Sequence, residues 1–299
     1  MRKIVFLLLP GLHLLDLAGP AQVFSTLAEL GRPVELHHVS ALPEVPTAQG
    51  VGLRSAVEWP ALGPDDLVLV PGWRIRGTAP HATPAQAEAL TAHHTAGGTV
   101  ASVCSGAFVL ARAGLLDGRR CTTHHTLQDE LARRYPRVRV VPDVLYVSDG
   151  RVVTSAGIAS GIDLALHLVT RWHGPSVAAS VAREMVVYAR RNGDQPQASA
   201  MLRHRSHPVD VVHRVQDTID ARYAEPLPLA ELAASAGVSE RTLTRAFTEA
   251  TGLTPLRYQQ RLRLERAEQL IGEGATMESA ARTVGFQDAR MLRRLRSHP

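Results

Sequence analysis

The sequence is poor in cysteine and in residues that carry positive charge other than arginine. Cys104 and Cys121 are the only two cysteines among 299 residues, which excludes a small secreted scaffold held together by disulfide bonds. Lys3 is the only lysine, so almost all of the positive charge resides on arginine. The net charge of +5 suits a polyanionic partner, but it is not concentrated in either half of the chain. Any argument for such a partner therefore depends on where individual arginines lie.

The sequence also lacks an apolar run long enough to cross a bilayer. The apolar start ends at Pro10 and Gly11, and Asp16 follows soon after, which is typical of a buried strand rather than a signal peptide. The histidines occur largely as adjacent pairs such as His93 and His94, whose side chains point apart, so no metal-ligand spacing is present. We therefore predict a cytoplasmic protein with no metal, no cofactor and no membrane contact.

The first 193 residues alternate strand-like and helix-like patterns. KIVFLLL, VELHHVSA, DLVLVPG and TVASV read as buried strands, and amphipathic segments separate most of them. This alternation predicts an α/β domain over residues 1–193, with a mainly parallel sheet sandwiched by helices. Ligands of such sheets bind at the carboxyl ends of the strands, where Gly11, Gly72 and Cys104 are expected.

Cys104 lies between a predicted strand and a predicted helix spanning residues 105–116. Ser102 and Gly106 are small neighbours, as a sharp strand-to-helix turn requires. The amino end of a helix lowers the pKa of a thiol, so this position favours a reactive or ligand-sensing cysteine. The alternative is a buried cysteine that only fills space.

Near the carboxyl end, residues 229–251 predict two short helices with a turn between them. Gly237 supplies the turn, and Ser239 is placed to cap the second helix. In that helix Leu243, Phe247 and Ala250 share the inner side. Five polar residues remain on the outer side: Glu240, Arg241, Thr244, Arg245 and Thr248. This pattern is typical of a helix-turn-helix that places its second helix in a DNA major groove, and the alternative is an ordinary helical pair.

A weaker second copy of this pattern follows a long predicted helix over residues 256–271. Its turn falls at Gly285 and Phe286, and its last helix carries three arginines: Arg290, Arg293 and Arg294. Two such units on one rigid helix would present two helices to successive major grooves. Residues 194–206 contain no clear periodicity and are the predicted linker, which leaves residues 207–299 as the second domain.

The segments GVSERTLTRAF, GLTP and AARTVGF resemble the DNA-binding domain of the AraC family of transcription regulators, over residues 207–296. The resemblance implies sequence-specific binding to double-stranded DNA. Carried over by position, it assigns DNA contacts to two groups of residues: Ser239, Arg241, Thr242 and Arg245 in the first unit, and Arg290, Arg293 and Arg294 in the second. The family normally has an aromatic residue near position 296 and a further short helix, whereas this chain has Arg296 and ends at Pro299. A truncated and loosely packed second unit is therefore expected.

The segments LVLVPG, VCSGAFVLARAG and VTSAGIASG, with the amino-terminal strand and helix, resemble the DJ-1/PfpI superfamily over residues 3–190. This superfamily is related to class I glutamine amidotransferases and has a flavodoxin-like fold. By position, Cys104 matches its cysteine, Asp16 the acid beside it, Gly72 the backbone of the anion pocket and His124 a nearby histidine. An acid beside a thiolate is expected to have a raised pKa and to donate a hydrogen bond to the sulfur.

Together the two resemblances predict an AraC-type regulator of promoter DNA whose first domain senses an unknown small-molecule effector, and which forms a homodimer. The competing hypothesis is a cysteine-dependent enzyme of the isonitrile hydratase type. Proteolysis and amidotransfer are not expected, because Ser105 stands where the PfpI-type proteases have the histidine that takes the thiol proton.

Overall fold

The computed structural model divides into two compact units, residues 1–197 and residues 198–299. It describes residues 1–73, 82–187, 193–194, 197, 207, 209–272 and 274–297. The predicted linker, residues 194–206, therefore falls almost wholly outside the described residues. Among the described helices, none has both the length and the apolar character that a bilayer span requires.

The first unit is built on a six-stranded sheet with the order β2-β1-β5-β6-β10-β9. All neighbouring strands are parallel except the edge strand β9, which is antiparallel to β10. In that order the strands span Val34–Val39, Arg2–Leu7, Leu67–Val70, Thr99–Val103, Val152–Ser155 and Tyr146–Asp149. This is the mainly parallel α/β sheet that the alternating sequence pattern predicts.

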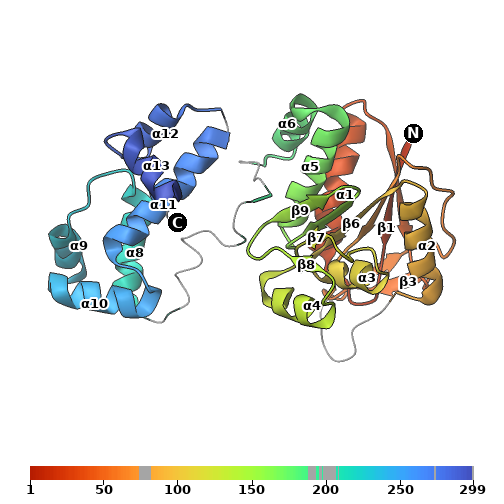
Figure 1. Ribbon diagram of the computed structural model, residues 1–299, viewed down its shortest axis with the longest axis horizontal. Helices are drawn as coiled ribbons and strands as arrows, with labels where there is room; N and C mark the ends of the chain where they lie inside the picture. Colours follow the sequence, from red (N-terminus) through yellow and green to blue (C-terminus); the bar gives the residue numbers. More distant parts are fainter. Residues whose placement is uncertain are drawn as a thin grey trace. The chain divides into compact units, whose positions relative to one another are not determined.

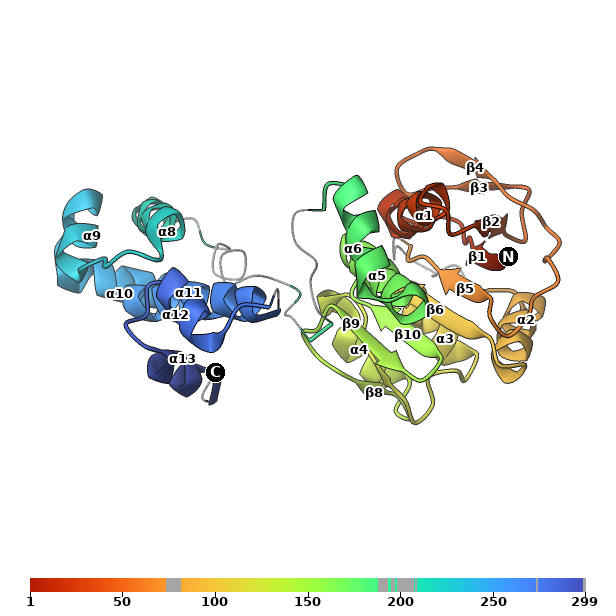
Figure 2. The same ribbon diagram turned by 90° about the horizontal axis from the view of Figure 1, so that it is seen from above.

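Helices cover both faces of this sheet (Figures 1 and 2). One face carries α1 (Leu14–Glu29), α5 (Ser160–His173) and α6 (Pro175–Glu184). The other carries α2 (Pro84–Thr95), α3 (Ala107–Arg112) and α4 (Gln128–Arg134).

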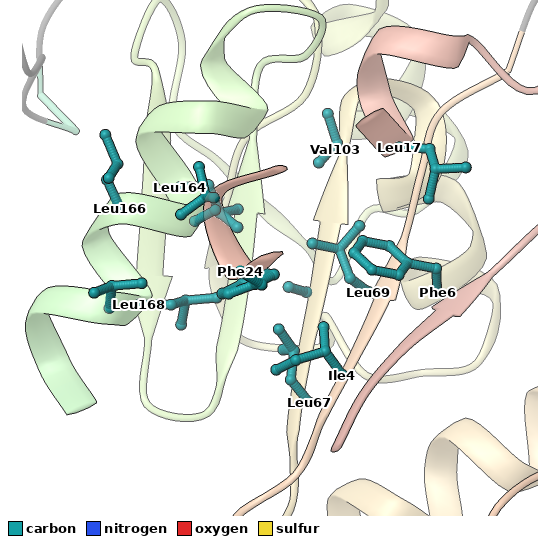
Figure 3. Close-up of a cluster of buried hydrophobic side chains, with 14 of the residues drawn as sticks. Ile4, Phe6, Leu17, Phe24, Leu67, Leu69, Val103, Leu164, Leu166 and Leu168 are labelled. Atoms are coloured by element: carbon teal, nitrogen blue, oxygen red, sulfur yellow. The ribbon is translucent and has the colours of Figure 1, made fainter. Parts of the chain in front are cut away.

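Successive residues of each strand point to opposite faces, so one strand contributes to two separate cores. Ile4 and Phe6 pack with Phe24 on the first face (Figure 3), whereas Val5 and Leu7 pack on the second. Because both faces are buried, the strands are apolar throughout rather than alternating with polar residues.

Several short elements were not expected from the sequence. Glu44–Pro46 and Gly52–Arg54 form the antiparallel pair β3 and β4, and Arg120–Cys121 and Arg139–Val140 form the parallel pair β7 and β8. The predicted helix over residues 105–116 is also shorter than expected. It begins with a 3-10 turn, η1 (Cys104–Gly106), and its α-helical part is α3 alone. A second 3-10 turn, η2 (His125–Leu127), precedes α4.

The described part of the second unit is helical. The first pattern gives α9 (Leu229–Ala236) and α10 (Glu240–Thr251), and α8 (Asp210–Arg222) precedes them. The long helix α11 (Pro255–Gly272) leads to the second pattern, α12 (Met277–Thr283) and α13 (Ala289–Ser297). Gly237 adopts a left-handed conformation at the end of α9, with φ of 70°, as the turn between the two helices requires.

Each helix pair of the second unit has its own small core. Leu243 and Phe247 are fully buried in the first, where the ring of Phe247 meets Tyr258 of α11 at 5.6 Å between centroids. In the second, Val284 and Leu292 are fully buried, and Phe286 is nearly so. The expectation that the second helix-turn-helix, α12 and α13, is loosely packed is therefore wrong, because α13 packs through Leu292 rather than through the residue at position 296.

Candidate functional site

Cys104 stands at the sharp corner between β6 and α3. The chain leaves β6 at Val103 in an extended conformation, and Cys104 itself has a φ of 55°. A residue with a side chain in this left-handed region is strained by about 1–3 kcal/mol, so the surrounding structure must hold it there. The Cys104 side chain is 6% exposed. The predicted corner is confirmed.

Glycines make the space around this corner. A Cβ atom added at Gly72 would lie 2.6 Å from Cβ of Cys104 and 2.5 Å from Oδ2 of Asp16. One added at Gly157 would collide with the Cys104 side chain, and one at Gly106 with the carbonyl of Val70. Each backbone approaches more closely than any residue with a side chain permits.

Asp16 joins three segments at this corner. Its carboxylate is fully buried at the start of α1, where Oδ2 accepts a hydrogen bond from the Gly72 amide at 3.2 Å. Oδ1 accepts one from the Ile158 amide at 2.9 Å, and Ile158 is held in a left-handed conformation with φ of 47°. We call the group of Asp16, Gly72, Cys104, Gly157 and Ile158 the Cys104 site.

Burial determines the protonation of both titratable groups of the Cys104 site. It raises the pKa of Asp16 to about 6, against the smaller opposing effect of hydrogen bonds from Ile158, Gly72 and the Cys104 thiol. Burial also raises the pKa of Cys104 to about 12, and the negative charge of Asp16 adds to this effect. The predicted lowering of the thiol pKa is therefore wrong: hydrogen bonds from Ser105 favour the thiolate less than burial and Asp16 oppose it.

Asp16 and Cys104 also interact with each other. Both carboxylate oxygens of Asp16 accept backbone amides, and the side-chain interaction with Cys104 lowers the pKa of Asp16 less than burial raises it. The raised pKa of the acid is as expected, and the hydrogen bond from the acid to the sulfur stays a prediction. At neutral pH the site therefore presents a protonated thiol beside an ionised carboxylate.

Neither Ser105 nor His124 is placed to take the proton of the Cys104 thiol. Ser105 is fully buried and both donates to and accepts from the backbone of Trp73, at 3.0 and 2.8 Å. Thr123 donates to the Cys104 carbonyl at 2.7 Å, which brings His124 to this side of the sheet. The His124 ring instead bonds the Thr126 hydroxyl at 2.8 Å, and burial lowers its pKa. Within the described residues, no hydrogen bond joins His124 to Cys104, and no group of three or more metal-ligating side chains is found.

The outer face of α10 is the second candidate site. Ser239 caps the helix as its position predicts, accepting the Thr242 amide at 3.1 Å. The Thr242 hydroxyl bonds Ser239 at 2.8 Å and so belongs to the cap. Arg241 and Arg245 are exposed. Both line a surface groove with Leu229, Glu240, Thr244, Thr248 and Glu249.

The groove adds Thr244 and Thr248 to the residues that the AraC resemblance assigns by position. Their spacing from Arg241 and Arg245, three or four residues along a helix, places all four on one face. We call this group of four the α10 face.

The arginines of α13 are exposed but differ in their partners. Arg293 is paired with Glu278 at 2.9 Å, and Arg294 lies 3.2 Å from the sulfur of Met291. Arg290 is exposed at the start of the helix. Arg296, which occupies the position of the expected aromatic, lies 3.7 Å from Glu268 of α11.

Comparison with known proteins accounts for both halves of the chain. Residues 2–171 match the DJ-1/PfpI family, and residues 232–296 match a helix-turn-helix domain. The chain is 32% identical over 282 residues to the HTH-type transcriptional regulator GbdR of Pseudomonas aeruginosa, which covers 90% of this chain and 74% of that protein. The chain belongs to the AraC-type regulators with an amino-terminal DJ-1/PfpI domain. It is a DNA-binding transcription regulator.

Two further similarities concern the first unit of this regulator. The isonitrile hydratase of Pseudomonas putida is 33% identical over 186 residues, covering 61% of this chain and 77% of the enzyme. A crystal structure of an AraC family transcriptional regulator from Pseudomonas putida superposes with a TM-score of 0.53 at 22% identity, covering 62% of this chain and all of that one, which shows the shared fold. The similarity to GbdR continues through the helix-turn-helix units, which supports the role of a regulator.

Proposed function

We propose that this regulator senses a small effector at the Cys104 site and that occupancy of the site changes how the second unit binds promoter DNA. The observation that carries the proposal is the buried Asp16, a charged group hydrogen-bonded to both Gly72 and Ile158. A ligand that changes the hydrogen bonds or the charge of Asp16 acts on three segments at once: the start of α1, the end of β5 and the strained turn that leads into α5.

The position of the site in the fold supports the same proposal. Cys104 follows the carboxyl end of β6 in a mainly parallel sheet, where ligands of such folds bind. Its thiol is protonated, and the carboxylate of Asp16 beside it raises the thiol pKa further, so the site is better suited to binding than to nucleophilic catalysis.

For DNA recognition we propose the α10 face as the first reading surface, with Ser239 and Thr242 holding the start of the helix. Arg290, Arg293 and Arg294 form the second surface, where Arg293 must exchange Glu278 for a phosphate or a base. We assign sensing to residues 1–193 and DNA binding to residues 207–299, with residues 194–206 as the linker. A homodimer acting in the cytoplasm would match paired half-sites on promoter DNA.

Gly72→Ala tests the sensing proposal. The added methyl group would press on Asp16 and Cys104, while the DNA-binding unit is untouched. Gly63→Ala is the matched control, because its added Cβ would have only an ordinary contact, 3.8 Å from Asp66. A reporter gene behind DNA that the protein binds is assayed in cells supplied with a panel of small metabolites.

We expect the unchanged protein and Gly63→Ala to respond to at least one compound. Gly72→Ala should lose that response and keep its affinity for the DNA. If Gly72→Ala does not fold, Cys104→Ala removes the thiol without adding atoms and should weaken the response. A normal response by both variants would rule out the Cys104 site as the sensor.

A further inference from the structure

We infer that Arg263 and Gln259 of α11 are positioning residues for DNA recognition: they fix the second helix-turn-helix in orientation against the first. The inference rests on the proposal that both α10 and α13 contact DNA. It assigns a role to side chains that lie on neither reading face.

Arg263 connects both helix-turn-helix units by hydrogen bonds to backbone carbonyls. Its Nε donates to Tyr223 at 2.6 Å and its Nη2 to Glu225 at 2.8 Å, both in the loop between α8 and α9. Its Nη1 donates to Gly285 at 2.9 Å, in the turn between α12 and α13. All three guanidinium nitrogens are thus used inside the protein, and the planar group fixes the directions of the bonds.

Gln259, one turn earlier on α11, binds the same loop. Its Nε2 donates to the carbonyls of Tyr223 and Glu225 at 2.9 and 2.8 Å, and the residue is 4% exposed. The loop between α8 and α9 is therefore attached to α11 at two successive turns, by a glutamine and an arginine that share their acceptors.

The loop over residues 223–225, in turn, lies directly against the second helix-turn-helix. The Tyr223 side chain packs on the core that contains Val284 and Leu292. Gly285 has a φ of 84°, and a Cβ atom added there would collide with the Ala224 carbonyl. The Arg263 guanidinium also lies 5.6 Å from the centre of the Phe286 ring. The two helix-turn-helix motifs thus meet through this loop as well as along α11.

This contact determines whether two reading helices meet one DNA duplex together. Successive major grooves repeat at about 34 Å, and the orientation of each helix must match its groove. A hinge between the two helix-turn-helix motifs would make the contact of α13 with DNA weaker and less dependent on the spacing of the two DNA segments. Arg263 and Gln259 remove such a hinge.

The test uses the full chain and DNA that this chain selects from a random library. Binding is measured on the selected site and on the same site with one base pair inserted between the segments protected by the two units, which rotates one against the other by about 35°. Arg263→Met removes the donors and keeps much of the side-chain volume. Arg266→Met is the matched control, since Arg266 is on the same helix and its hydrogen bond is to Gln269 of that helix.

We expect the insertion to weaken the unchanged protein and Arg266→Met about tenfold. Arg263→Met should bind the selected site about tenfold more weakly than the unchanged protein and lose less than about twofold on insertion. A general loss of folding would lower both affinities equally and leave the effect of the insertion intact. If Arg263→Met does not fold, Gln259→Leu should show the same reduced sensitivity to a smaller degree.

Full sensitivity to the insertion in folded Arg263→Met would overturn the inference. The double variant Arg290→Ala and Arg294→Ala separates this failure from that of the proposed second reading surface. If the double variant binds as tightly as the unchanged protein, α13 does not contact DNA and the proposed function fails at that point. If it binds weakly while Arg263→Met keeps its sensitivity to spacing, only the positioning role fails.

Discussion

The two candidate sites of this regulator hold their polar groups in opposite ways. At the Cys104 site, Asp16 is fully buried and Cys104 is 6% exposed, and both have raised pKa values because burial disfavours their charged forms. On the α10 face, Arg241 and Arg245 are exposed and line a surface groove. The first arrangement withdraws its polar groups from solvent, and the second presents them to it.

This difference separates the effects of substitution. A change at the Cys104 site affects the backbone turns that Asp16 and the glycines hold together, so it alters the local fold. A change on the α10 face removes an exposed side chain and leaves the core unchanged. A solvent-accessible Cys104 thiol, or loss of folding after substitutions on the α10 face, would contradict this difference.

The reactivity of Cys104 should differ most from that of an exposed residue. A pKa raised from 9.0 to about 12 lowers the thiolate fraction near neutral pH about a thousandfold, so alkylation by iodoacetamide should be slower by about that factor. The rate is followed by mass spectrometry of the peptide that contains Cys104, with the urea-unfolded chain as the reference. Asp16→Asn should speed the reaction, because the charge of Asp16 raises the thiol pKa. Rapid alkylation of the folded protein at neutral pH would show an accessible thiolate and contradict the account.

The stability of the first unit should depend on the titration of Asp16. The folded-state pKa of about 6 lies above the ordinary value of 3.8, so the protonated carboxyl favours folding. This contribution is complete at the acid end and is lost as the pH rises through about 6. The unchanged protein should therefore lose about 3 kcal/mol of unfolding free energy, relative to Asp16→Asn, as the pH rises from about 3.5 to about 7.

Tryptophan fluorescence during urea unfolding measures this difference selectively, since Trp59, Trp73 and Trp172 all belong to the first unit. Comparing the two proteins at each pH cancels the titration of other groups. A difference that does not change with pH would show that Asp16 titrates as an exposed carboxyl does.

The smallest expected effect is at the start of α10. Ser239→Ala removes the acceptor for the Thr242 amide and should cost about 1 kcal/mol of local stability, measured by amide hydrogen exchange along α10. Ser235→Ala is the control, because its hydroxyl donates to a carbonyl of its own helix and does not cap α10. Equal exchange in the two variants would remove the cap from the account.

Sequence rules predict the parts of this protein that depend on neighbours along the chain. The corner at Cys104, the turn at Gly237 and the cap at Ser239 follow from a few consecutive residues, and the structure has all three. The alternation of strands and helices likewise predicts the sheet. Each of these features is determined by backbone geometry or by local hydrophobic periodicity.

The remaining features depend on residues that are far apart in the sequence. The raised pKa of Cys104 results from burial and from Asp16, 88 residues earlier in the printed sequence. Arg263 looks like one more surface arginine of an amphipathic helix until the loop over residues 223–225 is placed against it. The hydroxyl of Thr242, to which the family resemblance assigns a DNA contact by position, bonds the cap residue Ser239, and no local pattern in the sequence predicts that bond.

DNA recognition by the α10 face is tested most directly by the affinity of Arg241→Ala and Arg245→Ala for DNA selected by the full chain, compared with random DNA at the same salt concentration. Each variant should lose about 1–3 kcal/mol of binding free energy on the selected site and much less on random DNA. Arg133→Ala, an exposed arginine of the first unit, should bind like the unchanged protein. Equal affinity of the unchanged protein for selected and random DNA, or unaltered binding by both α10 variants, would contradict sequence-specific recognition by the α10 face.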